Sequence, residues 1–185
     1  MTPDEILAVS RRAVCLHTEA EVEAAIDALA GQVSTALRDR NPLLLCLMNG
    51  GLVFSGKLLT RLAFPLQIDY LHATRYRNNT QGSELEWHRL PALSLHGRDV
   101  LILDDILDEG ATLAAVVAHC RAQGAARVLI AVLVDKHHER KVPGIRADFV
   151  GLRVEDRYLY GYGMDYRGYL RNAAGIYAVD PVDCD

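Results

Sequence analysis

The sequence is short of cysteine and of long apolar runs, and both shortages exclude classes of protein. Its four cysteines lie far apart and form no C-x-x-C pair, so no disulfide framework is predicted. Cys15 and Cys46 fall within apolar stretches and are expected to be buried. No apolar run approaches the roughly 20 residues of a membrane-spanning helix, and residues 1–5 lack the basic start of a signal peptide. We therefore expect a reduced, cytoplasmic protein with no membrane partner.

The chain also lacks an excess of positive charge. Lysine and arginine number 20 against 24 aspartates and glutamates, for a formal net charge of −4 at pH 7. Because nucleic-acid backbones select for basic surfaces, we expect no nucleic-acid partner. A small polyanionic substrate is compatible with this charge, since one local site can bind it. With 50% hydrophobic residues, the 185-residue chain is expected to form one globular domain with a sizeable core.

What the sequence does contain is an alternation of helix and strand patterns. Two capping boxes, Thr2 with Glu5 and Thr18 with Glu21, predict the starts of helices. After the N-terminal helix, helices are expected over residues 18–38, 52–63 and 111–123. Strands are expected over residues 13–17, 43–48, 66–71, 99–103 and 127–134. This order predicts an α/β fold with a mostly parallel sheet flanked by helices.

Two segments lack this periodicity. Residues 74–88 are polar and aperiodic, which predicts a long loop of the kind that is usually functional or mobile. Residues 149–179 are rich in tyrosine and glycine and predict a small C-terminal subdomain, or hood, over the sheet. His137 and His138 are adjacent in a predicted loop, so we expect them to be solvated and not to form a metal site.

The most informative segment runs from the strand at 99–103 into the helix at 111–123. Asp104 and Asp105 directly follow the apolar part of the strand, and ligands of open α/β sheets bind at that carboxyl end. The loop over residues 108–112 then leads into a helix, where backbone N–H groups can bind an anion. In this loop Gly110 permits close backbone approach, and Thr112 can donate a hydroxyl hydrogen bond.

Acids beside a phosphate loop make chemical sense if they bind something other than the phosphate. Asp104 and Asp105 are predicted to hold ribose hydroxyls and Mg²⁺, which prefers oxygen ligands and substrate phosphates. The 5′-phosphate would then lie on the loop Asp108, Glu109, Gly110, Ala111 and Thr112. The alternative is that a strand-end aspartate merely caps the following helix. For a single aspartate we would favour the cap, but D-D-x-x-D-E-G-x-T favours binding.

This segment resembles the phosphoribosyl-pyrophosphate signature of the type I phosphoribosyltransferases. Over residues 40–178 the chain is most similar to the hypoxanthine-guanine members of that family. The resemblance implies the type I phosphoribosyltransferase fold, formed as one domain by residues 1–185 with the hood as a small C-terminal subdomain. It also implies a homodimer or homotetramer, and Mg²⁺ as cofactor.

Four further features carry the resemblance and imply roles for single residues. Asn49 and Gly50 fall at a pyrophosphate-binding turn, and Arg75 and Tyr76 fall at a loop that closes over phosphoribosyl pyrophosphate. Lys136 is similar to a lysine that contacts the exocyclic oxygen of a purine. The segment 154–166 resembles a base-binding hood. Three of the remaining implied roles concern the purine site: Tyr158 stacks on the base, Leu159 offers its backbone to the purine, and Asp165 helps to bind a second metal there. Arg171 is implied to bind pyrophosphate.

The chain departs from the family pattern at three of these positions. The family often has lysine where Asn49 stands, serine where Arg75 stands and phenylalanine where Tyr158 stands. A basic residue of the closing loop, Arg75 or Arg77, could compensate for the missing lysine at the pyrophosphate turn. None of the departures falls in the acid-rich loop.

The implied activity joins hypoxanthine or guanine to phosphoribosyl pyrophosphate, giving IMP or GMP and pyrophosphate. Lys136 can only donate hydrogen bonds, which favours a purine with an oxygen at position 6 over adenine. Asp108 is the expected catalytic residue, accepting the proton or hydrogen bond of purine N7.

Three alternatives stay open at this point. The first is a phosphoribosyltransferase for another base, with xanthine ahead of adenine or a pyrimidine. The second is a regulatory protein that senses phosphoribosyl pyrophosphate and binds nucleic acid, although Arg11 and Arg12 are too few for a basic patch. The third is a flavodoxin-like signalling domain, which would leave the tyrosine- and glycine-rich hood unexplained.

Overall fold

The computed structural model describes residues 1–75 and 85–184, with the side chain of Arg75 excepted. Its helices are α1 (Pro3–Arg12), α2 (Glu19–Leu37), α3 (Gly51–Leu59), α4 (Ala111–Ala122) and the short 3₁₀ turn η1 (Pro181–Asp183). Its strands are β1 (Val14–Thr18), β2 (Leu43–Met48), β3 (Gln67–Arg75), β4 (Leu85–Arg89), β5 (Asp99–Leu107), β6 (Arg127–His137), β7 (Phe149–Glu155), β8 (Leu159–Tyr160) and β9 (Gly175–Ala178).

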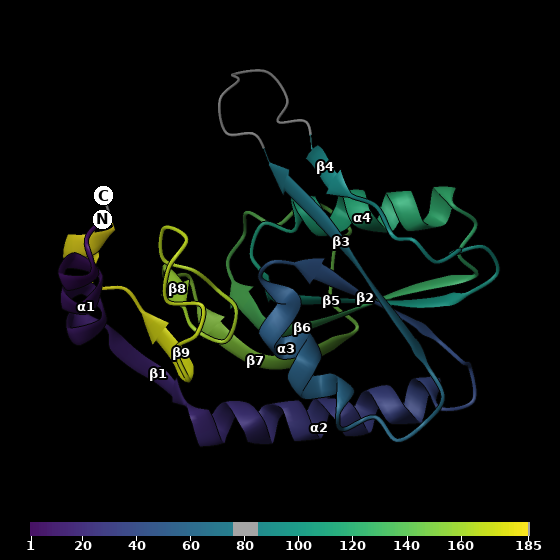
Figure 1. Ribbon diagram of the computed structural model, residues 1–185, viewed down its shortest axis with the longest axis horizontal. Coiled ribbons are helices and arrows are strands. Elements are labelled where there is room, and N and C mark those ends of the chain that lie inside the picture. Colours follow the sequence, from purple (N-terminus) through teal and green to yellow (C-terminus); the bar gives the residue numbers. More distant parts are fainter. Residues whose placement is uncertain (76–84, 185) are drawn as a thin grey trace.

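The larger sheet has six strands in the order β4-β3-β2-β5-β6-β7. All neighbours in it are parallel except β4, which pairs antiparallel with β3 at one edge. Helices α2 and α3 cover one face of this sheet and α4 covers the other (Figure 1). The predicted α/β fold with a mostly parallel, helix-flanked sheet is confirmed.

The alternation of strand side chains explains why both faces are covered. Leu44 of β2 packs into the core beneath α2 and α3, whereas its neighbours Leu43 and Leu45 pack into the core beneath α4. All three side chains are fully buried. A strand buried on both faces needs apolar residues at every position, which is why this segment reads as a continuous apolar run.

The helix starts follow the capping boxes. Thr2 and Glu5 exchange hydrogen bonds at the start of α1, with Thr2 N donating to Glu5 Oε2 over 2.6 Å. Thr18 and Glu21 do the same at the start of α2, where the corresponding distance is 2.7 Å. Each box satisfies backbone N–H groups that a helix end otherwise leaves without partners, and both predictions are confirmed.

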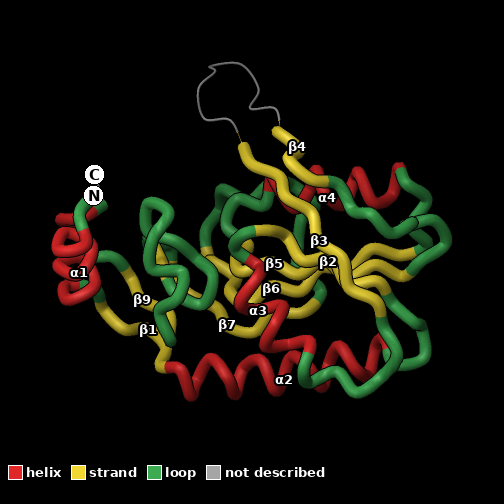
Figure 2. The backbone as a smooth tube through the Cα atoms, viewed as in Figure 1, coloured by secondary structure: helices red, strands yellow, loops and turns green. Residues whose placement is uncertain are grey.

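A second, three-stranded sheet forms the hood, in the order β1-β9-β8 (Figure 2). It joins the two ends of the chain, because β1 pairs antiparallel with β9. Helix α1 packs on it through Ile6 and Val9, which contact Tyr160 and Tyr166 in a separate apolar cluster. The hood was expected over residues 149–179, but β7 (149–155) instead pairs with β6 as the edge of the larger sheet.

Two other expectations are corrected. The long loop expected over residues 74–88 is partly strand: β3 extends to Arg75 and β4 covers Leu85–Arg89, while residues 76–84 lie outside the described chain. Cys15 is exposed, because β1 has a solvent-facing side. Cys46, in the buried strand β2, is buried as predicted. Within the part of the chain that is described, no helix has the length and apolar character to cross a membrane.

Candidate active site

The two strand-end aspartates lie on β5 just beyond the point where its pairing with β2 stops. β2 pairs with β5 up to the pair Cys46 and Leu103, whereas β5 continues beside β6 as far as Leu107. Asp104 and Asp105 therefore belong to the strand itself rather than following it. One side of this stretch of β5 is consequently open to the turn after β2.

That turn lies directly against the acids. A Cβ atom added to Gly50 would lie 2.2 Å from Oδ2 of Asp105, and one added to Gly51 would lie 2.6 Å from the carbonyl oxygen of Leu103. Only glycine permits so close an approach of the two segments. The turn begins with a cis peptide bond between Met48 and Asn49. The structure thus brings the predicted pyrophosphate turn and the predicted ribose acids together.

Asp104 and Asp105 are buried carboxylates, 9% and 7% exposed. The backbone N–H of Asp105 donates to Oδ1 of Asp104 over 3.0 Å. Burial raises the pKa of Asp104 well above its ordinary value, and the adjacent charge of Asp105 adds to this effect. Burial also raises the pKa of Asp105, against the opposing charge of Arg171. Two acids held this way favour a bound cation or hydroxyl donors.

The loop between β5 and α4 has the geometry of an anion site. Gly110 is the residue before α4 and has a left-handed backbone, with φ 80°. A Cβ atom there would lie 2.7 Å from Cγ2 of Ile145 and 2.8 Å from Cδ1 of Leu107, so the position also leaves no room for a side chain. Gly110 offers no side chain to cap the helix. The first N–H groups of α4, at Ala111 and Thr112, are therefore suited to an external anion.

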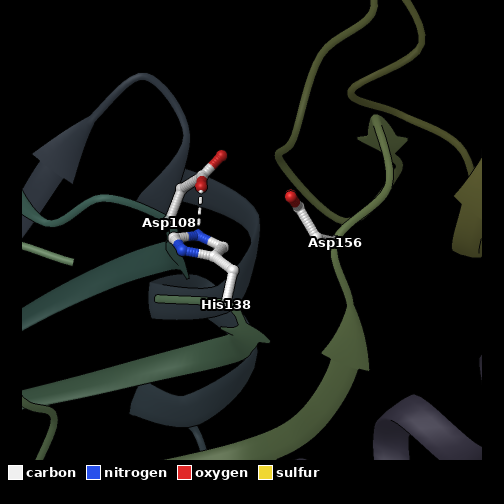
Figure 3. Close-up of side chains that lie close together, drawn as sticks. All are labelled: Asp108, His138 and Asp156. Carbon is white, nitrogen blue, oxygen red and sulfur yellow. Dashed lines mark hydrogen bonds and ion pairs between the residues drawn. The ribbon is translucent and has the colours of Figure 1, made fainter. Parts of the chain in front are cut away.

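Asp108, at the start of this loop, accepts hydrogen bonds from two side chains. Nζ of Lys136 lies 2.7 Å from its Oδ2. Nε2 of His138 lies 2.7 Å from its Oδ1 (Figure 3). The Lys136 and His138 side chains are 10% and 4% exposed, and that of Asp108 is 42% exposed. Partial burial works to raise the pKa of Asp108, but these two donors outweigh it and hold the pKa below its ordinary value.

The expectation that His138 is solvated is therefore wrong, whereas His137 is exposed. β6 ends at His137, and the chain after it turns back over the loop at the end of β5. The backbone N–H of Val142 donates to the carbonyl oxygen of Glu109 over 2.8 Å, which fixes this return. The His138 ring is consequently enclosed between two loops that lie far apart in the sequence.

A further acid, Asp156, faces this group from the segment after β7 (Figure 3). One ligand atom each from Asp108, His138 and Asp156 lies within 4.8 Å of the others, close enough for a metal ion. A cation already lies there, however, because Nζ of Lys136 is 2.7 Å from Asp108 and 3.8 Å from Asp156. Arg140 also pairs with Asp156 over 2.6 Å. The group is accordingly better described as a hydrogen-bonded cluster than as a metal site.

The hood residues near this cluster include an exposed aromatic ring. Tyr158 is 37% exposed, and its ring centroid lies 5.5 Å from that of Tyr166. Its hydroxyl oxygen accepts a hydrogen bond from the backbone N–H of Arg167 over 3.2 Å. Leu159 follows as a buried residue of β8. The exposed fraction of Tyr158 leaves ring surface for a flat ligand.

The hood also contacts the turn after β2. A Cβ atom added to Gly163 would lie 2.0 Å from the carbonyl oxygen of Gly50. Arg171 donates to the carbonyl oxygen of Gly163 over 2.6 Å and pairs with Asp165 over 2.7 Å. The charges of Asp165 and Arg171 both act on Asp105, so the hood pair belongs to the same electrostatic group as the strand-end acids.

The predicted site residues thus fall into two adjoining groups at the carboxyl end of the sheet. One contains Asn49, Gly50, Asp104, Asp105, Asp165 and Arg171, and the other contains the 108–112 loop, Lys136, Tyr158 and Leu159. Arg75 ends β3 but its side chain is not described, and Tyr76 lies outside the described residues.

Three residues of the cluster were missed by the sequence analysis: His138, Arg140 and Asp156. Their shared signal is weak, because a run of polar residues after a strand usually indicates a solvated loop. The sequence signal that could have found His138 is its position two residues after Lys136, at the end of a strand that delivers Lys136 to the site.

The chain is similar to several known proteins. A model of the phosphoribosyl transferase domain matches residues 15–166. A hypoxanthine-guanine phosphoribosyltransferase of Bacillus subtilis (strain 168) is 34% identical over 167 residues, which cover 90% of this chain and 92% of that protein. A hypoxanthine-guanine-xanthine phosphoribosyltransferase of Tritrichomonas foetus is 29% identical over 157 residues, covering 85% and 86%. The crystal structure of a hypoxanthine phosphoribosyltransferase from Staphylococcus aureus has a TM-score of 0.87 at 27% identity, covering 93% and 94%.

The matched region runs from β1 into the hood and includes the strand-end acids and the loop after them. The similarity therefore extends to the segments that build the site as well as to the fold. On these grounds the chain belongs to the phosphoribosyltransferase family, together with the relatives named hypoxanthine-guanine phosphoribosyltransferases.

Proposed function

We propose that this chain is a purine-salvage enzyme that transfers the phosphoribosyl group of phosphoribosyl pyrophosphate to hypoxanthine or guanine, with release of pyrophosphate. The observation that carries the proposal is the meeting of the glycine-containing loop over residues 108–112, two buried acids and a buried lysine at one end of the sheet. Lys136 reaches Asp108 of the loop over 2.7 Å, so a base-recognising donor and the phosphate loop lie within one hydrogen bond of each other.

The proposed phosphoribosyl-pyrophosphate site uses both groups of residues. The N–H groups and hydroxyl of residues 108–112 would hold the 5′-phosphate, as helix N-termini do for anions. The carboxylates of Asp104 and Asp105 would accept hydrogen bonds from the ribose hydroxyls. Asn49, Gly50 and Arg171 would hold the pyrophosphate. Arg75 and Tyr76 stay predictions for this substrate.

Mg²⁺ is the proposed cofactor, and the chemistry of the donor set fits it. Asp104 and Asp105 offer buried carboxylate oxygens at the sheet end, and Asp165 offers another on the hood side. Oxygen ligands together with substrate phosphates are the usual environment of protein-bound Mg²⁺. When bound, the ion supplies positive charge to the departing pyrophosphate. Asp104 and Asp105 are proposed for one site, and Asp165 for a second.

The purine is proposed to lie between the hood and the phosphate loop. The exposed ring surface of Tyr158 would stack on the base, and the backbone of Leu159 would recognise its edge. Lys136 would donate a hydrogen bond to the oxygen at position 6. An amino group at that position, as in adenine, cannot accept this hydrogen bond. This supports hypoxanthine and guanine over adenine.

Asp108 is the proposed catalytic residue. It would accept the N7 proton, or its hydrogen bond, and so make the base a better nucleophile. The base would then attack C1 of the ribose as pyrophosphate leaves. Its depressed pKa keeps it ionised and therefore able to accept at neutral pH. Burial of the reacting atoms would keep water from competing with the base.

Xanthine is the second candidate base, because a relative with 29% identity is named for all three 6-oxopurines. We further propose that the enzyme works in the cytoplasm as a homodimer or homotetramer. Four exposed apolar or aromatic side chains of the β3–β4 side support self-association: Ile68, Tyr70, Leu90 and Leu93. Light scattering on the purified protein would measure the oligomeric state.

The decisive experiment is an assay of the purified protein with phosphoribosyl pyrophosphate, Mg²⁺ and one base at a time: hypoxanthine, guanine, xanthine, adenine or uracil. Rapid nucleotide formation from hypoxanthine or guanine, lost on chelation of Mg²⁺, is the expected result. Turnover of adenine or uracil alone would contradict the role of Lys136. Binding of phosphoribosyl pyrophosphate without turnover of any base would instead favour the sensor alternative.

A further inference from the structure

We infer that His138 is a positioning residue for Asp108: it holds the Oδ1 oxygen of the carboxylate, so that Oδ2 is the oxygen presented to the purine. The inference rests on the proposed function and adds to it a residue that contacts neither substrate. It is carried by the arrangement of hydrogen bonds around the His138 ring, by the enclosure of that ring and by the support of the loop beneath it.

The hydrogen bonds of the ring fix which nitrogen carries the proton. Nδ1 of His138 accepts from the backbone N–H of Arg140 over 3.1 Å, so Nδ1 has a lone pair and no hydrogen. In the neutral ring the proton is therefore on Nε2. Nε2 lies 2.7 Å from Oδ1 of Asp108 and donates to it. Both nitrogens are satisfied only with the ring in this orientation.

The two oxygens of Asp108 have different partners, and only one of these, Lys136, is also proposed to contact the purine. Oδ2 is bound by Lys136, which the proposed function needs at the purine oxygen. When Lys136 turns to the base, Oδ2 loses its donor and becomes available to N7. Oδ1 keeps its hydrogen bond to His138, so the carboxylate does not rotate as the lysine leaves. In this arrangement His138 holds the Asp108 carboxylate in place, and Lys136 is left to recognise the purine.

The surroundings of His138 make it a stable anchor. Its side chain is 4% exposed, so water does not compete for Oδ1 from that side. The segment that carries it is fastened to the same loop twice more, by the hydrogen bond from Val142 to Glu109 and by Ile145 against Gly110. Consecutive residues 108, 109 and 110 are therefore each held by the segment after β6. The anchor and its target cannot easily move apart.

The activity test compares His138→Leu, which removes the donor, with His138→Gln, whose amide N–H can replace it. His138→Leu is expected to lower kcat for hypoxanthine on the order of tenfold, as for a lost hydrogen bond to a charged group. The KM for phosphoribosyl pyrophosphate should change less than about twofold, because the loop backbone is still held by Val142 and Ile145. His138→Gln should recover most of the loss. His137→Leu and His137→Gln, at the exposed neighbour, are the matched controls and should behave as wild type.

A spectroscopic test addresses the hydrogen bond without relying on turnover. Nitrogen-15 NMR of the ring should show a neutral His138 protonated at Nε2, with an exchange-protected Nε2 proton that disappears in Asp108→Ala. A ring protonated at Nδ1, or an unprotected Nε2 proton, would overturn the inference. So would wild-type kcat in His138→Leu, or an equal loss in His138→Gln. Wild-type protein that turns over none of the bases would remove the proposed function and the positioning role with it, whereas an active wild type with unaffected His138 variants would remove only the latter.

Discussion

Asp104–Asp105 and Asp108 lie only three positions apart along the chain, yet their electrostatic surroundings are opposite. The first two are buried and have raised pKa values, because burial disfavours their charged form. Asp108 is partly exposed and has a lowered pKa, because Lys136 and His138 donate to it. The difference indicates two kinds of task. In the proposed function, the first pair of acids binds a cation and ribose hydroxyls, and Asp108 is held ionised to accept from the base.

The largest effect is expected from removing the charge of Asp108. Asp108→Asn should lower kcat by about 100-fold, within the range for general acid–base groups, because an amide cannot take a proton. The affinity for phosphoribosyl pyrophosphate, measured by calorimetry, should change little. Asp39→Asn, an exposed aspartate far along the sequence, is the control. Unchanged turnover in Asp108→Asn would dismiss the proposed catalytic role.

The next effect tests the contact of the pyrophosphate turn with the buried acids. In Gly50→Ala the new Cβ would lie 2.2 Å from Oδ2 of Asp105, so one segment must shift. A displacement near 1 Å at a substrate site should raise the KM for phosphoribosyl pyrophosphate by about tenfold or more. Gly56→Ala, in α3 and with open space around it, is the matched control and should leave KM unchanged. Equal kinetics for the two variants would mean that the turn does not bind substrate.

Stability measurements should separate the two kinds of acid by sign. In metal-free protein at pH 7, Asp104→Asn is expected to raise the free energy of unfolding by about 1 kcal/mol, because it removes an unfavourable buried charge. Asp108→Asn should lower it by about 1 kcal/mol, because Lys136 and His138 lose a charged acceptor. Chemical denaturation with and without Mg²⁺ would measure both. If both variants changed the free energy of unfolding in the same direction, the two kinds of acid would not differ in the way described.

The smallest effect concerns the attachment of the hood. Glu23 of α2 pairs with Lys57 of α3 and accepts from the hydroxyl of Tyr162 in the hood, and these contacts lower the pKa of Glu23 to about 2. Glu23→Gln should lower the free energy of unfolding by less than about 1 kcal/mol at pH 7. A depressed pKa contributes stability above the ordinary value of 4.5 that is lost as the pH falls toward 2. The difference in thermal stability between the wild type and Glu23→Gln should therefore shrink as the pH falls over that interval. A difference that stays constant would mean that the charge of Glu23 does not stabilise the fold.

Much of the fold could be predicted because its signals are local. The capping boxes, the apolar run of β2 and the turn at Gly110 each depend on a few adjacent residues. The parts that could not be predicted depend on distant partners. β4 alternates Leu85 and Trp87 with polar residues, but it is only five residues long and forms by pairing with β3. β1 was expected as a strand, but its place in the hood depends on its pairing with β9.

The candidate site divides in the same way. The acids and the loop over residues 108–112 could be found because they lie at the end of one buried strand in a fixed pattern. His138 could not, since its burial depends on a loop that folds back over residues 108–110. Asp156 pairs with Arg140, sixteen positions away in the sequence, and no local sequence pattern around either residue indicates this contact.

The pairing of β1 with β9 has a consequence for biosynthesis. Val14 lies opposite Ala178, so a strand that is translated before the larger sheet completes its own sheet with a strand that is translated after it. The larger sheet can assemble while β8 and β9 are still being translated, since its strands all precede them. The segment with Tyr158 therefore receives the support of β9 only after the larger sheet has been translated. The proposed phosphate loop is thus made before the proposed surface for the base is complete.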